Sequence, residues 1–311
     1  MGPGLDGILV VAKPAGPTSH DVVALIRRLA ATKRVGHGGT LDPFASGVLP
    51  IFLGRATRVA EYHLGDSKRY RATVCFGATS STDDLEGELE PVAGPAVTRE
   101  VVEGALERFR GRITQTPPAF SAVKVGGRRA YALARAGKTV ELQPRDVEIY
   151  ALDVTAWDES EPDRPLATIE LECSAGTYVR ALARDLGAAV GSGAYLGALV
   201  RTASGPFRLE EATPLDEVRT AAADGPAPLQ RLLRPIDAGL ESLPSVRLGA
   251  ADLAAVSRGQ VVRAPQAGDP TEGPVRLVAP DGTLVGFGRR IDGRVAPDKV
   301  LVAPIAPEVD E

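Results

Sequence analysis

The chain opens with an apolar run followed by an amphipathic segment. Residues 7–12 (GILVVA) are continuously apolar, as in a buried strand. Between residues 20 and 32 apolar residues recur at intervals of four and three, which predicts an amphipathic helix with Ser19 as its N-cap. A glycine-dense loop, residues 35–50, follows. The first 50 residues therefore predict a strand, a helix and a long loop.

Strand-like and helix-like patterns continue through the middle of the chain. Alternating or apolar runs predict strands at residues 69–77, 147–156 and 167–173. Helical spacing favours helices at 99–109 and 178–190. An acidic stretch, TDDLEGELE, follows the first of these strands. We expect it to be a solvated loop.

The C-terminal part has a different pattern. Residues 214–243 are rich in alanine and proline with one helical piece, and we interpret them as a connector. Short strands and glycine turns follow, and the Asp281–Gly282 pair between two strand-like runs is a strong hairpin signal. We therefore divide the chain into residues 1–236 and a small, mostly β domain, residues 244–311.

Length and composition narrow the class of protein. The 311 residues suit one large and one small domain, and 44% hydrophobic with 24% charged residues excludes global disorder. No apolar run approaches the roughly 20 residues that span a bilayer. The N-terminal sequence MGPGLDG lacks the basic and hydrophobic parts of a secretion signal. We expect a soluble, cytoplasmic protein with no membrane partner.

Cysteines and histidines are few. Cys75 and Cys173 lie in separate strand-like runs, and we expect two buried free thiols rather than a disulfide. His20, His37 and His63 belong to no Cys/His cluster, so we expect no bound metal. The sequence also lacks the P-loop pattern, a complete G-x-G-x-x-G and the G-x-S-x-G elbow. These absences disfavour nucleotide-driven chemistry, hydride transfer and serine hydrolysis.

Positive charge is concentrated in one segment, although the net charge of the chain is −4. Between Arg108 and Arg145 one acidic residue, Glu141, stands against nine basic residues: Arg108, Arg110, Arg112, Lys124, Arg128, Arg129, Arg135, Lys138 and Arg145. Such clustering favours an anionic partner. A solvated basic face is the alternative.

The glycine-dense loop carries the first candidate for chemistry. Three glycines flank His37, which lets the main chain approach a bulky partner closely. Asp42 precedes Pro43, which favours an extended backbone. An aspartate on such a loop can act as a nucleophile or general base. It can equally form an Asx turn with its own main chain, and spacing alone does not decide between the two.

Four motifs resemble one known family. The segment GHGGTLDPFASGVLPIFLGRATR closely resembles the catalytic motif of the TruB family of tRNA pseudouridine synthases, which modify uridine 55 in the T-loop. GILVVAKPAGPTSHDVV resembles the first motif of that family, KRYRA its second and CSAGTYVRALARDLG its third. They occur in family order across residues 5–210. Ala12 stands where the family commonly has aspartate, and Gly38 where it often has threonine. Neither departure touches the aspartate of the loop.

The resemblance implies a fold, a reaction and site residues. The fold is expected to be α/β (α+β), with a mixed, mainly antiparallel central sheet flanked by helices. Asp42 resembles the catalytic nucleophile of the family, which attacks either C1′ of the ribose or C6 of the base. Arg180 resembles the arginine that pairs with it, and such a cation lowers the pKa of a carboxylate. The isomerisation involves no net redox change, so no cofactor is expected. Lys13 and Pro14 are expected to be structural.

The remaining site residues follow from the same motifs. Tyr70 resembles the catalytic residue that stacks on the flipped base and helps remove its C5 proton, although a tyrosine in an alternating strand usually packs in a core. His37 resembles the residue that fills the gap left in the RNA stack. Tyr178 and Leu199 resemble residues lining the uracil pocket. The enzyme has to flip the uridine out of the folded T-loop to reach it.

The resemblance also implies how the RNA is held. The basic segment 108–145 fits the part of the family that grips the T-arm of tRNA, and residues 244–311 resemble a PUA-like RNA-binding domain. We expect a monomer. One alternative is a non-catalytic tRNA-binding or tRNA-folding protein on the same scaffold. Another is a carboxylate glycosidase, which needs a second acid beside Asp42. Asp84 and Glu86 lie in the loop expected to be solvated, which disfavours it.

Overall fold

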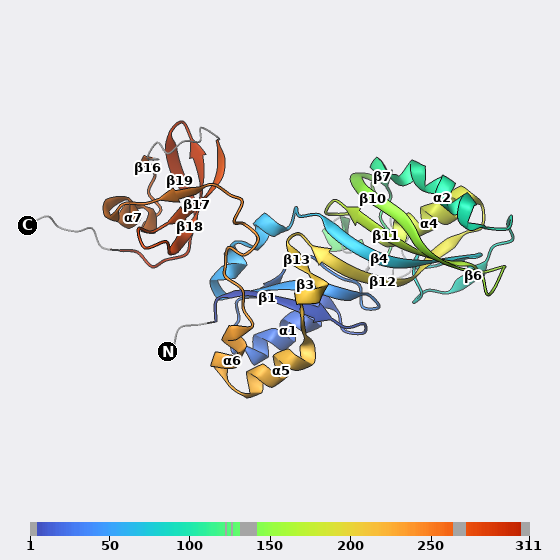
Figure 1. Cartoon of the computed structure of the whole chain (residues 1–311), viewed down its shortest axis with the longest axis horizontal. Helices are drawn as coiled ribbons and strands as arrows, with labels where there is room; N and C mark the ends of the chain where they lie inside the picture. Colours follow the sequence, from blue (N-terminus) through green and yellow to red (C-terminus); the bar gives the residue numbers. More distant parts are fainter. Residues whose placement is uncertain (1–4, 122, 126, 131–141, 264–271, 306–311) are drawn as a thin grey trace, which may run out of the picture.

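The computed structural model describes residues 5–305, apart from residues 122, 126, 131–141 and 264–271. The described residues form a ten-stranded sheet, a separate five-stranded sheet and two two-stranded hairpins. Figure 1 shows the large sheet running through the body of the molecule and the smaller sheet set apart at one end. No helix in the described ranges is long and apolar enough to cross a membrane.

The large sheet is mixed and mainly antiparallel, as expected. Its main path runs in the order β14 (Thr213–Pro214), β1 (Gly7–Lys13), β3 (Ser46–Leu53), β12 (Ala194–Ser204), β4 (Lys68–Phe76), β11 (Leu166–Cys173), β10 (Arg145–Asp158) and β7 (Gly111–Gln115). Two short strands pair beside this path, β2 (Val35–His37) with β3 and β13 (Phe207–Arg208) with β12. Only the pairs β1–β14 and β3–β12 are parallel.

Helices cover the two halves of this sheet (Figure 1). Helices α1 (Ser19–Leu29), α5 (Leu215–Ala223) and α6 (Pro226–Arg231) pack against β1 and β3 through one apolar cluster. Helices α2 (Arg99–Leu106) and α4 (Val179–Val190) pack against β4, β11 and β12 through another. Short 3-10 turns η1 (Gly54–Arg58), η2 (Ala60–His63), η3 (Glu107–Phe109) and η4 (Leu209–Glu211) connect these elements.

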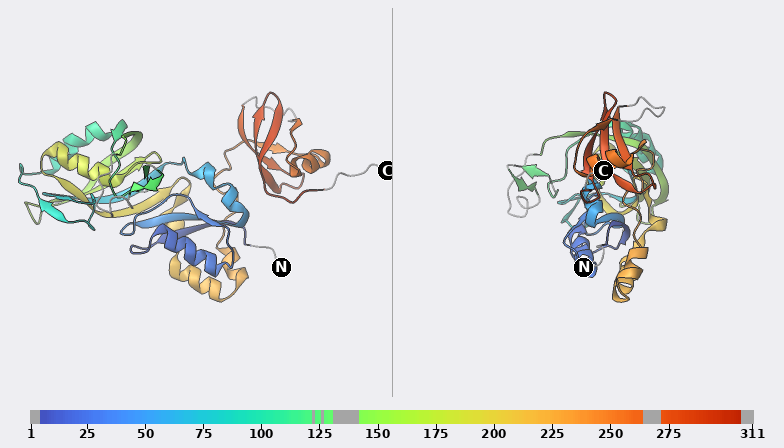
Figure 2. Two further views of the ribbon diagram at one scale, coloured as in Figure 1. Left: turned by 180° about the vertical axis from the view of Figure 1, so that it is seen from behind. Right: turned by 90° about the vertical axis from the view of Figure 1, so that its left-hand side faces the viewer.

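Two hairpins stand outside the large sheet. The first pairs β5 (Ala78–Ser80) with β6 (Leu89–Pro91), and the second pairs β8 (Lys124–Val125) with β9 (Arg128–Arg129). The green β8–β9 hairpin projects from the body in the right-hand view of Figure 2. It belongs to the basic segment singled out in the sequence. Residues 131–141 of the same segment lie outside the described residues.

The smaller sheet is built from residues 245–300. Its strands follow the order β15 (Ser245–Arg247), β17 (Gly273–Val278), β18 (Leu284–Ile291), β19 (Arg294–Val300) and β16 (Val262–Arg263), with helix α7 (Ala250–Ser257) packed beside them. The predicted hairpin joins β17 to β18, and Gly282 takes a left-handed φ of +88° in its turn. Helix α7 was not expected from the sequence.

The two sheets meet at the segment η1–η2. The rings of Tyr62 and Phe287 lie 5.0 Å apart, and the Tyr62 hydroxyl donates to Asp298 at 3.2 Å. Arg58 donates to the carbonyl oxygen of Val300. Phe287 also belongs to an apolar cluster whose other members come mostly from the large sheet and its connections. The smaller sheet is therefore docked against the body of the protein by both apolar and polar contacts.

Several local expectations need correction. Strand β12 was missed altogether. Thr18, not Ser19, caps α1: its side chain accepts from the Asp21 N–H, and the Asp21 carboxylate accepts from the Thr18 N–H. The segment 214–243 is not only a connector, because α5 and α6 bury Val218 and Leu229 in the core beside α1. Both cysteines are free thiols, but only Cys173 is buried, while Cys75 is half-buried.

Candidate active site

A cleft of about 990 Å³ opens over the centre of the large sheet. Its walls come from the loop after β2, from β4 and β12, from the acidic loop and from the segment leading into α4. Five of the six residues expected at the site line it: Asp42, Tyr70, Tyr178, Arg180 and Leu199. The sixth, His37, lies beside this lining. The fold thus brings together residues from three separate motifs and Leu199 from β12.

The loop that carries Asp42 is fixed by contacts from the first motif. Lys13 is buried, and its ammonium donates to the carbonyl oxygens of Ala45 at 2.7 Å and Pro43 at 3.3 Å. The hydroxyl of Ser19 accepts from the Leu41 N–H at 2.8 Å. Lys13 is thus structural, as expected. Ser19 has a role that the sequence did not reveal.

Asp42 faces Arg180 rather than its own main chain. Nε of Arg180 lies 2.9 Å from one carboxylate oxygen of Asp42, and Nη2 lies 3.3 Å from the other. The turn itself is closed by the main chain, where Ala45 N–H donates to the Asp42 carbonyl oxygen at 3.2 Å. The Asp42 side chain remains 34% exposed, so its carboxylate is accessible from the cleft. The structure therefore shows a presented carboxylate rather than an Asx turn.

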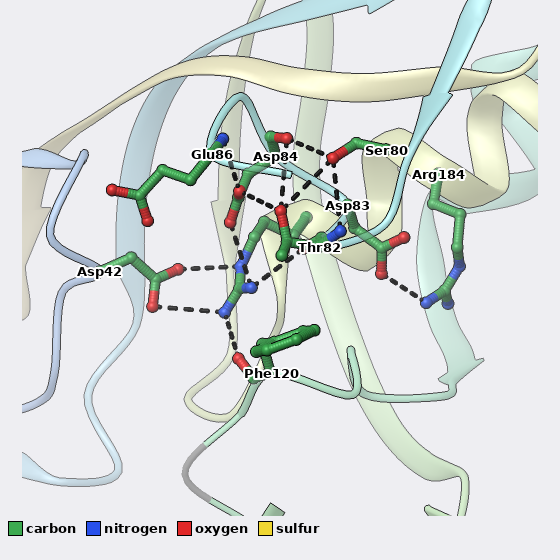
Figure 3. A network of polar contacts seen from close by, with 9 residues as sticks. Asp42, Ser80, Thr82, Asp83, Asp84, Glu86, Phe120 and Arg184 are labelled. Carbon is green, nitrogen blue, oxygen red and sulfur yellow. Dashed lines mark hydrogen bonds and ion pairs between the residues drawn. The ribbon is translucent and has the colours of Figure 1, made fainter. Parts of the chain in front are cut away.

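Arg180 is shared between two carboxylates. It is the second residue of α4, and its side chain is only 6% exposed. Its Nη1 lies 3.2 Å from the Asp84 carboxylate and donates to the Thr82 carbonyl oxygen at 3.1 Å, while Nη2 donates to Phe120 O at 2.9 Å. Figure 3 shows Asp42 and Asp84 on different sides of the same guanidinium. Every edge of the guanidinium is thereby engaged.

The expectation that Asp84 is solvated was wrong. Its side chain is 4% exposed, and it accepts from the Thr82 hydroxyl at 2.5 Å and from Glu86 N–H at 3.0 Å. The acidic loop folds over the cleft because Leu196 N–H on β12 donates to the Asp83 carbonyl oxygen. Glu86, by contrast, is exposed, as expected. An acidic stretch in the sequence does not reveal that Asp84 pairs with Arg180, an arginine far along the chain.

Burial and charge oppose one another at Asp42. Burial raises the pKa of Asp42 and outweighs the opposite effect of Arg180, while the charge of Asp84 adds to the rise. The pKa of Asp42 is therefore raised, whereas the sequence suggested that Arg180 would lower it. Burial also lowers the pKa of Lys13 to about 8, despite the attraction of Asp42. Asp42 therefore becomes protonated at a higher pH than a free aspartate, and Lys13 loses its proton at a lower pH than a free lysine.

Tyr70 and Leu199 form the apolar wall beside Asp42. Both are buried, at 9% and 7% exposure, and both belong to the core cluster under the cleft. Burial raises the pKa of the Tyr70 hydroxyl, which therefore keeps its proton near neutral pH. The tyrosine is thus both a core residue and a wall of the cleft. Its raised pKa disfavours the phenolate form that abstraction of a proton would need.

Tyr178 stands at the other side of the cleft, immediately before α4. Its main chain is held by the buried Gln115, whose amide accepts from Tyr178 N–H at 3.0 Å and donates to its carbonyl oxygen at 3.1 Å. The guanidinium of Arg145 lies 5.4 Å from the centre of the Tyr178 ring. Gln115 was not singled out in the sequence, and an isolated glutamine carries no pattern that would reveal it.

His37 ends strand β2 next to the cleft. Its Nδ1 accepts from the Gly39 N–H at 3.3 Å, and its ring lies edge-on to His20 at 5.5 Å. Burial, with the nearby charges of His20 and Arg201, lowers the pKa of His37. The imidazole is therefore held neutral and in a fixed orientation at the rim.

The described residues contain no group of three or more His, Cys, Asp or Glu side chains arranged to hold a metal ion. The two aspartates of the cleft are instead bound to one guanidinium. The available chemistry is that of a presented carboxylate beside a protonated tyrosine.

Two solved structures share this architecture over nearly the whole chain. A structure described as an H/ACA RNP bound to a substrate RNA containing 2′-deoxyuridine matches 97% of this chain and 86% of its own, with a TM-score of 0.72 and 26% identity. A Cbf5-Nop10-Gar1 complex matches 96% of this chain and 86% of its own, with a TM-score of 0.73 and 27% identity. Fold, site and sequence family together define a pseudouridine synthase, an isomerase.

Sequence families narrow this class. Residues 27–179 match the TruB family pseudouridylate synthase N-terminal domain, residues 180–241 the tRNA pseudouridylate synthase B C-terminal domain, and residues 244–301 the pseudouridine synthase II TruB C-terminal family. A relative from Pseudomonas aeruginosa (strain UCBPP-PA14) named tRNA pseudouridine synthase B is 42% identical over 96% of both chains. One of the same name from Thermobifida fusca (strain YX) is 44% identical over 94% of this chain and 97% of its own. The chain belongs to the TruB family of pseudouridine synthases.

Proposed function

We propose that this enzyme converts uridine 55 in the T-loop of tRNA to pseudouridine, with Asp42 as the nucleophile. Relatives named tRNA pseudouridine synthase B, 42–44% identical over nearly the whole chain, support tRNA as the substrate. The observation that carries the mechanism is the carboxylate of Asp42, exposed to the cleft and held at 2.9 Å by a buried arginine.

The reaction exchanges one bond of the base for another. The glycosidic bond from N1 to C1′ breaks, the uracil turns, and C5 bonds to C1′. C5 loses its proton and N1 gains one, so atoms and electrons balance without an external oxidant or reductant. Asp42 has to be ionised to attack either C1′ or C6, and the ion pair with Arg180 stabilises that form. No cofactor has a place in this scheme.

The cleft suits a base turned out of its stack. Its volume of about 990 Å³ accommodates a nucleotide, and base flipping supplies the route from the folded T-loop into it. Tyr70 stacks on the flipped uracil, and Tyr178 and Leu199 line its pocket. His37, held rigid at the rim, fills the gap left in the RNA. These roles agree with where the side chains lie.

Affinity comes from surfaces outside the cleft. The basic segment 108–145, which includes the projecting β8–β9 hairpin, binds phosphates of the T-arm, and the smaller sheet serves as a PUA-like RNA-binding domain. In this scheme a monomer made of residues 1–236 and 244–311 binds one tRNA. Base recognition in the cleft then supplies specificity.

An assay with the purified full chain tests this function. The enzyme is incubated with an unmodified tRNA transcript in buffer containing EDTA and no cofactor, and pseudouridine is mapped. We expect a single new pseudouridine at position 55, with Asp42→Asn inactive yet still folded and bound to tRNA. Loss of activity that added metal restores would contradict the cofactor-free scheme. Turnover by Asp42→Asn within about tenfold of the parent would contradict the nucleophile and favour a scaffold that binds tRNA without this chemistry.

A further inference from the structure

Arg201 on β12 is a fully buried arginine at the wall of the cleft, with 1% exposure. Its guanidinium donates to three main-chain carbonyl oxygens: Val48 O at 2.7 Å, Gly39 O at 3.1 Å and Thr40 O at 3.3 Å. Gly39 and Thr40 lie just before Asp42, and Val48 lies at the start of β3 just after the loop. One side chain therefore joins the two ends of the loop that presents the nucleophile.

The main chain at Arg201 holds the same loop. Arg201 pairs with Gly47 across the parallel strands β12 and β3. Gly47 has a φ of +112°, and a Cβ there would lie only 2.2 Å from the carbonyl oxygen of Arg201. Only glycine permits this approach. The exit of the loop is therefore fixed against the backbone that also carries the guanidinium.

The burial of this charge is costly and calls for a functional reason. In the described part of the chain, no ion pair joins Arg201 to a carboxylate, and carbonyl dipoles of the loop hold its guanidinium instead. Burial is the main reason that the pKa values of Lys13, Lys68 and His37 are lowered, and the charge of Arg201 lowers them further. A buried apolar side chain of similar size would avoid both the cost of burying a charge and the effect on the neighbouring charged groups. Stability alone therefore does not explain an arginine at this position.

Tyr70 is the second partner of Arg201. The two residues lie directly opposite one another on the antiparallel strands β12 and β4, so their side chains share the cleft face of the sheet. Burial raises the pKa of the Tyr70 hydroxyl, and the nearby charge of Arg201 opposes this rise. Arginine only donates, so a hydrogen bond between these two side chains has the phenol oxygen as its acceptor and leaves the phenol proton available to an acceptor in the cleft.

We propose that Arg201 is a positioning residue for the isomerisation, holding the Asp42 loop at both ends and setting the Tyr70 hydroxyl as a hydrogen-bond donor toward the base. The inference rests on the proposed function, because it assigns Arg201 to the same cleft. It predicts that Arg201 acts on the chemical step through Asp42 and Tyr70. It does not predict that Arg201 contributes to the affinity for tRNA.

The first test is Arg201→Lys, which keeps the charge but loses the fork that spans three carbonyl groups. With an unmodified tRNA transcript, we expect the single-turnover rate at saturating enzyme to fall at least about tenfold, while the Kd for tRNA stays within about threefold. Arg71→Lys is the matched control, because Arg71 follows Tyr70 on β4, points to the other face and pairs with Glu170 at the surface. A parental rate in Arg201→Lys would overturn the proposal.

A double-mutant cycle tests the route through Tyr70. If Arg201 acts partly through the phenol, the combined variant Arg201→Lys with Tyr70→Phe should lose less activity than the product of the two single losses. A purely structural arginine would give independent, multiplicative effects. That result would overturn the assigned effect on Tyr70.

A third measurement needs no variant and covers the case in which Arg201→Lys does not fold. A crystal structure of the full parent chain should show the guanidinium within hydrogen-bond distance of the Gly39 and Thr40 carbonyl oxygens and the Tyr70 hydroxyl. A guanidinium turned away from them would overturn the proposal. Failure of the proposed function is recognised separately, since the parent chain would then form no pseudouridine.

Discussion

The buried carboxylate of Asp84 lies 3.2 Å from Nη1 of Arg180, the same guanidinium that holds Asp42. The cation is therefore balanced from two sides, one closed to solvent and one open to the cleft. Asp84 forms an ion pair with Arg180 on the buried side, and this competing pair weakens the hold of Arg180 on Asp42. Its charge also contributes to the raised pKa of Asp42.

Asp84→Asn tests this balance. The amide keeps an oxygen for the Thr82 hydroxyl but removes the negative charge, so Arg180 is left to Asp42 alone. We expect the single-turnover rate to fall at least about tenfold, equivalent to about 1.4 kcal/mol in the barrier. Binding of tRNA should be nearly unchanged. Glu88→Gln, on the same loop but exposed, is the control, and an equal rate for both variants would contradict a special role for Asp84.

The acid side of the pH profile should report Asp42. Its pKa is raised above the ordinary 3.8, and the ionised form is needed for attack, so the single-turnover rate should fall as pH decreases through a value above 3.8. The effect on the free energy of unfolding has the opposite sign. Because the pKa of Asp42 is higher in the folded than in the unfolded chain, protonation of Asp42 stabilises the folded protein, and this stabilisation is lost as pH rises. Single-turnover rates measured from about pH 4 to 7 test for this decrease. A rate that stays constant down to pH 4 would exclude it.

The alkaline side should report Lys13. Above a pKa of about 8 its amine loses a proton, and two N–H groups remain for the three carbonyl oxygens of Pro14, Pro43 and Ala45. The Asp42 loop is then held less firmly, and the rate should decline above about pH 8. Thermal stability should not decline for this reason, because a lowered folded-state pKa makes this contribution increase with pH from about 8 toward the ordinary 10.5. Parallel rate and melting measurements separate the two effects, and a rate that is flat to about pH 9.5 would refute the assignment.

Salt dependence should reveal the basic segment. Neutralising Arg128 and Arg129 together should weaken tRNA binding and flatten its salt dependence, by roughly 0.7 to 0.9 in the log–log slope for each phosphate that is no longer neutralised. The single-turnover rate at saturating enzyme should change little, because the chemistry takes place in the cleft. Binding titrations at four or more salt concentrations give the slope. An unchanged slope would mean that the two arginines form a solvated face.

The junction between the sheets should respond to Tyr62→Ala. This change removes the ring that lies 5.0 Å from Phe287 and the hydroxyl bonded to Asp298. We expect thermal unfolding to separate into two transitions, and tRNA binding to weaken more than the single-turnover rate. Tyr150→Ala, which alters an exposed tyrosine on β10, is the matched control. A single unshifted transition in Tyr62→Ala would show that the contact does not couple the sheets.

Much of the fold is encoded locally, and the parts that were missed have identifiable causes. Strand β4 was predicted from its alternation, and the burial of alternate residues from Lys68 to Phe76 confirms it. Strand β12 was not predicted because small residues such as Ala194, Gly197 and Ala198 weaken its pattern, although it forms the middle of the sheet. Its position depends on pairing with β3 and β4, which are far away in the sequence. Such long-range pairing leaves little local signal.

The site divides in the same way. The motifs predicted the positions of Asp42, Tyr70 and Arg180, and the structure places all three at one cleft. Asp84 and Arg201 were not recognised, because their environment comes from distant strands and loops. Charge in a sequence predicts exposure on average, and both residues depart from that rule by being buried with their polar atoms engaged.

The contact between Tyr62 and Phe287 has a consequence for the shape of RNA that can bind. The segment η1–η2 that carries this contact leads directly into Leu64 at the edge of the cleft and then into β4. The cleft and the smaller sheet are thus joined by packed side chains as well as by the chain itself. If the RNA binds at both places, as proposed above, its folded shape has to match the distance between them.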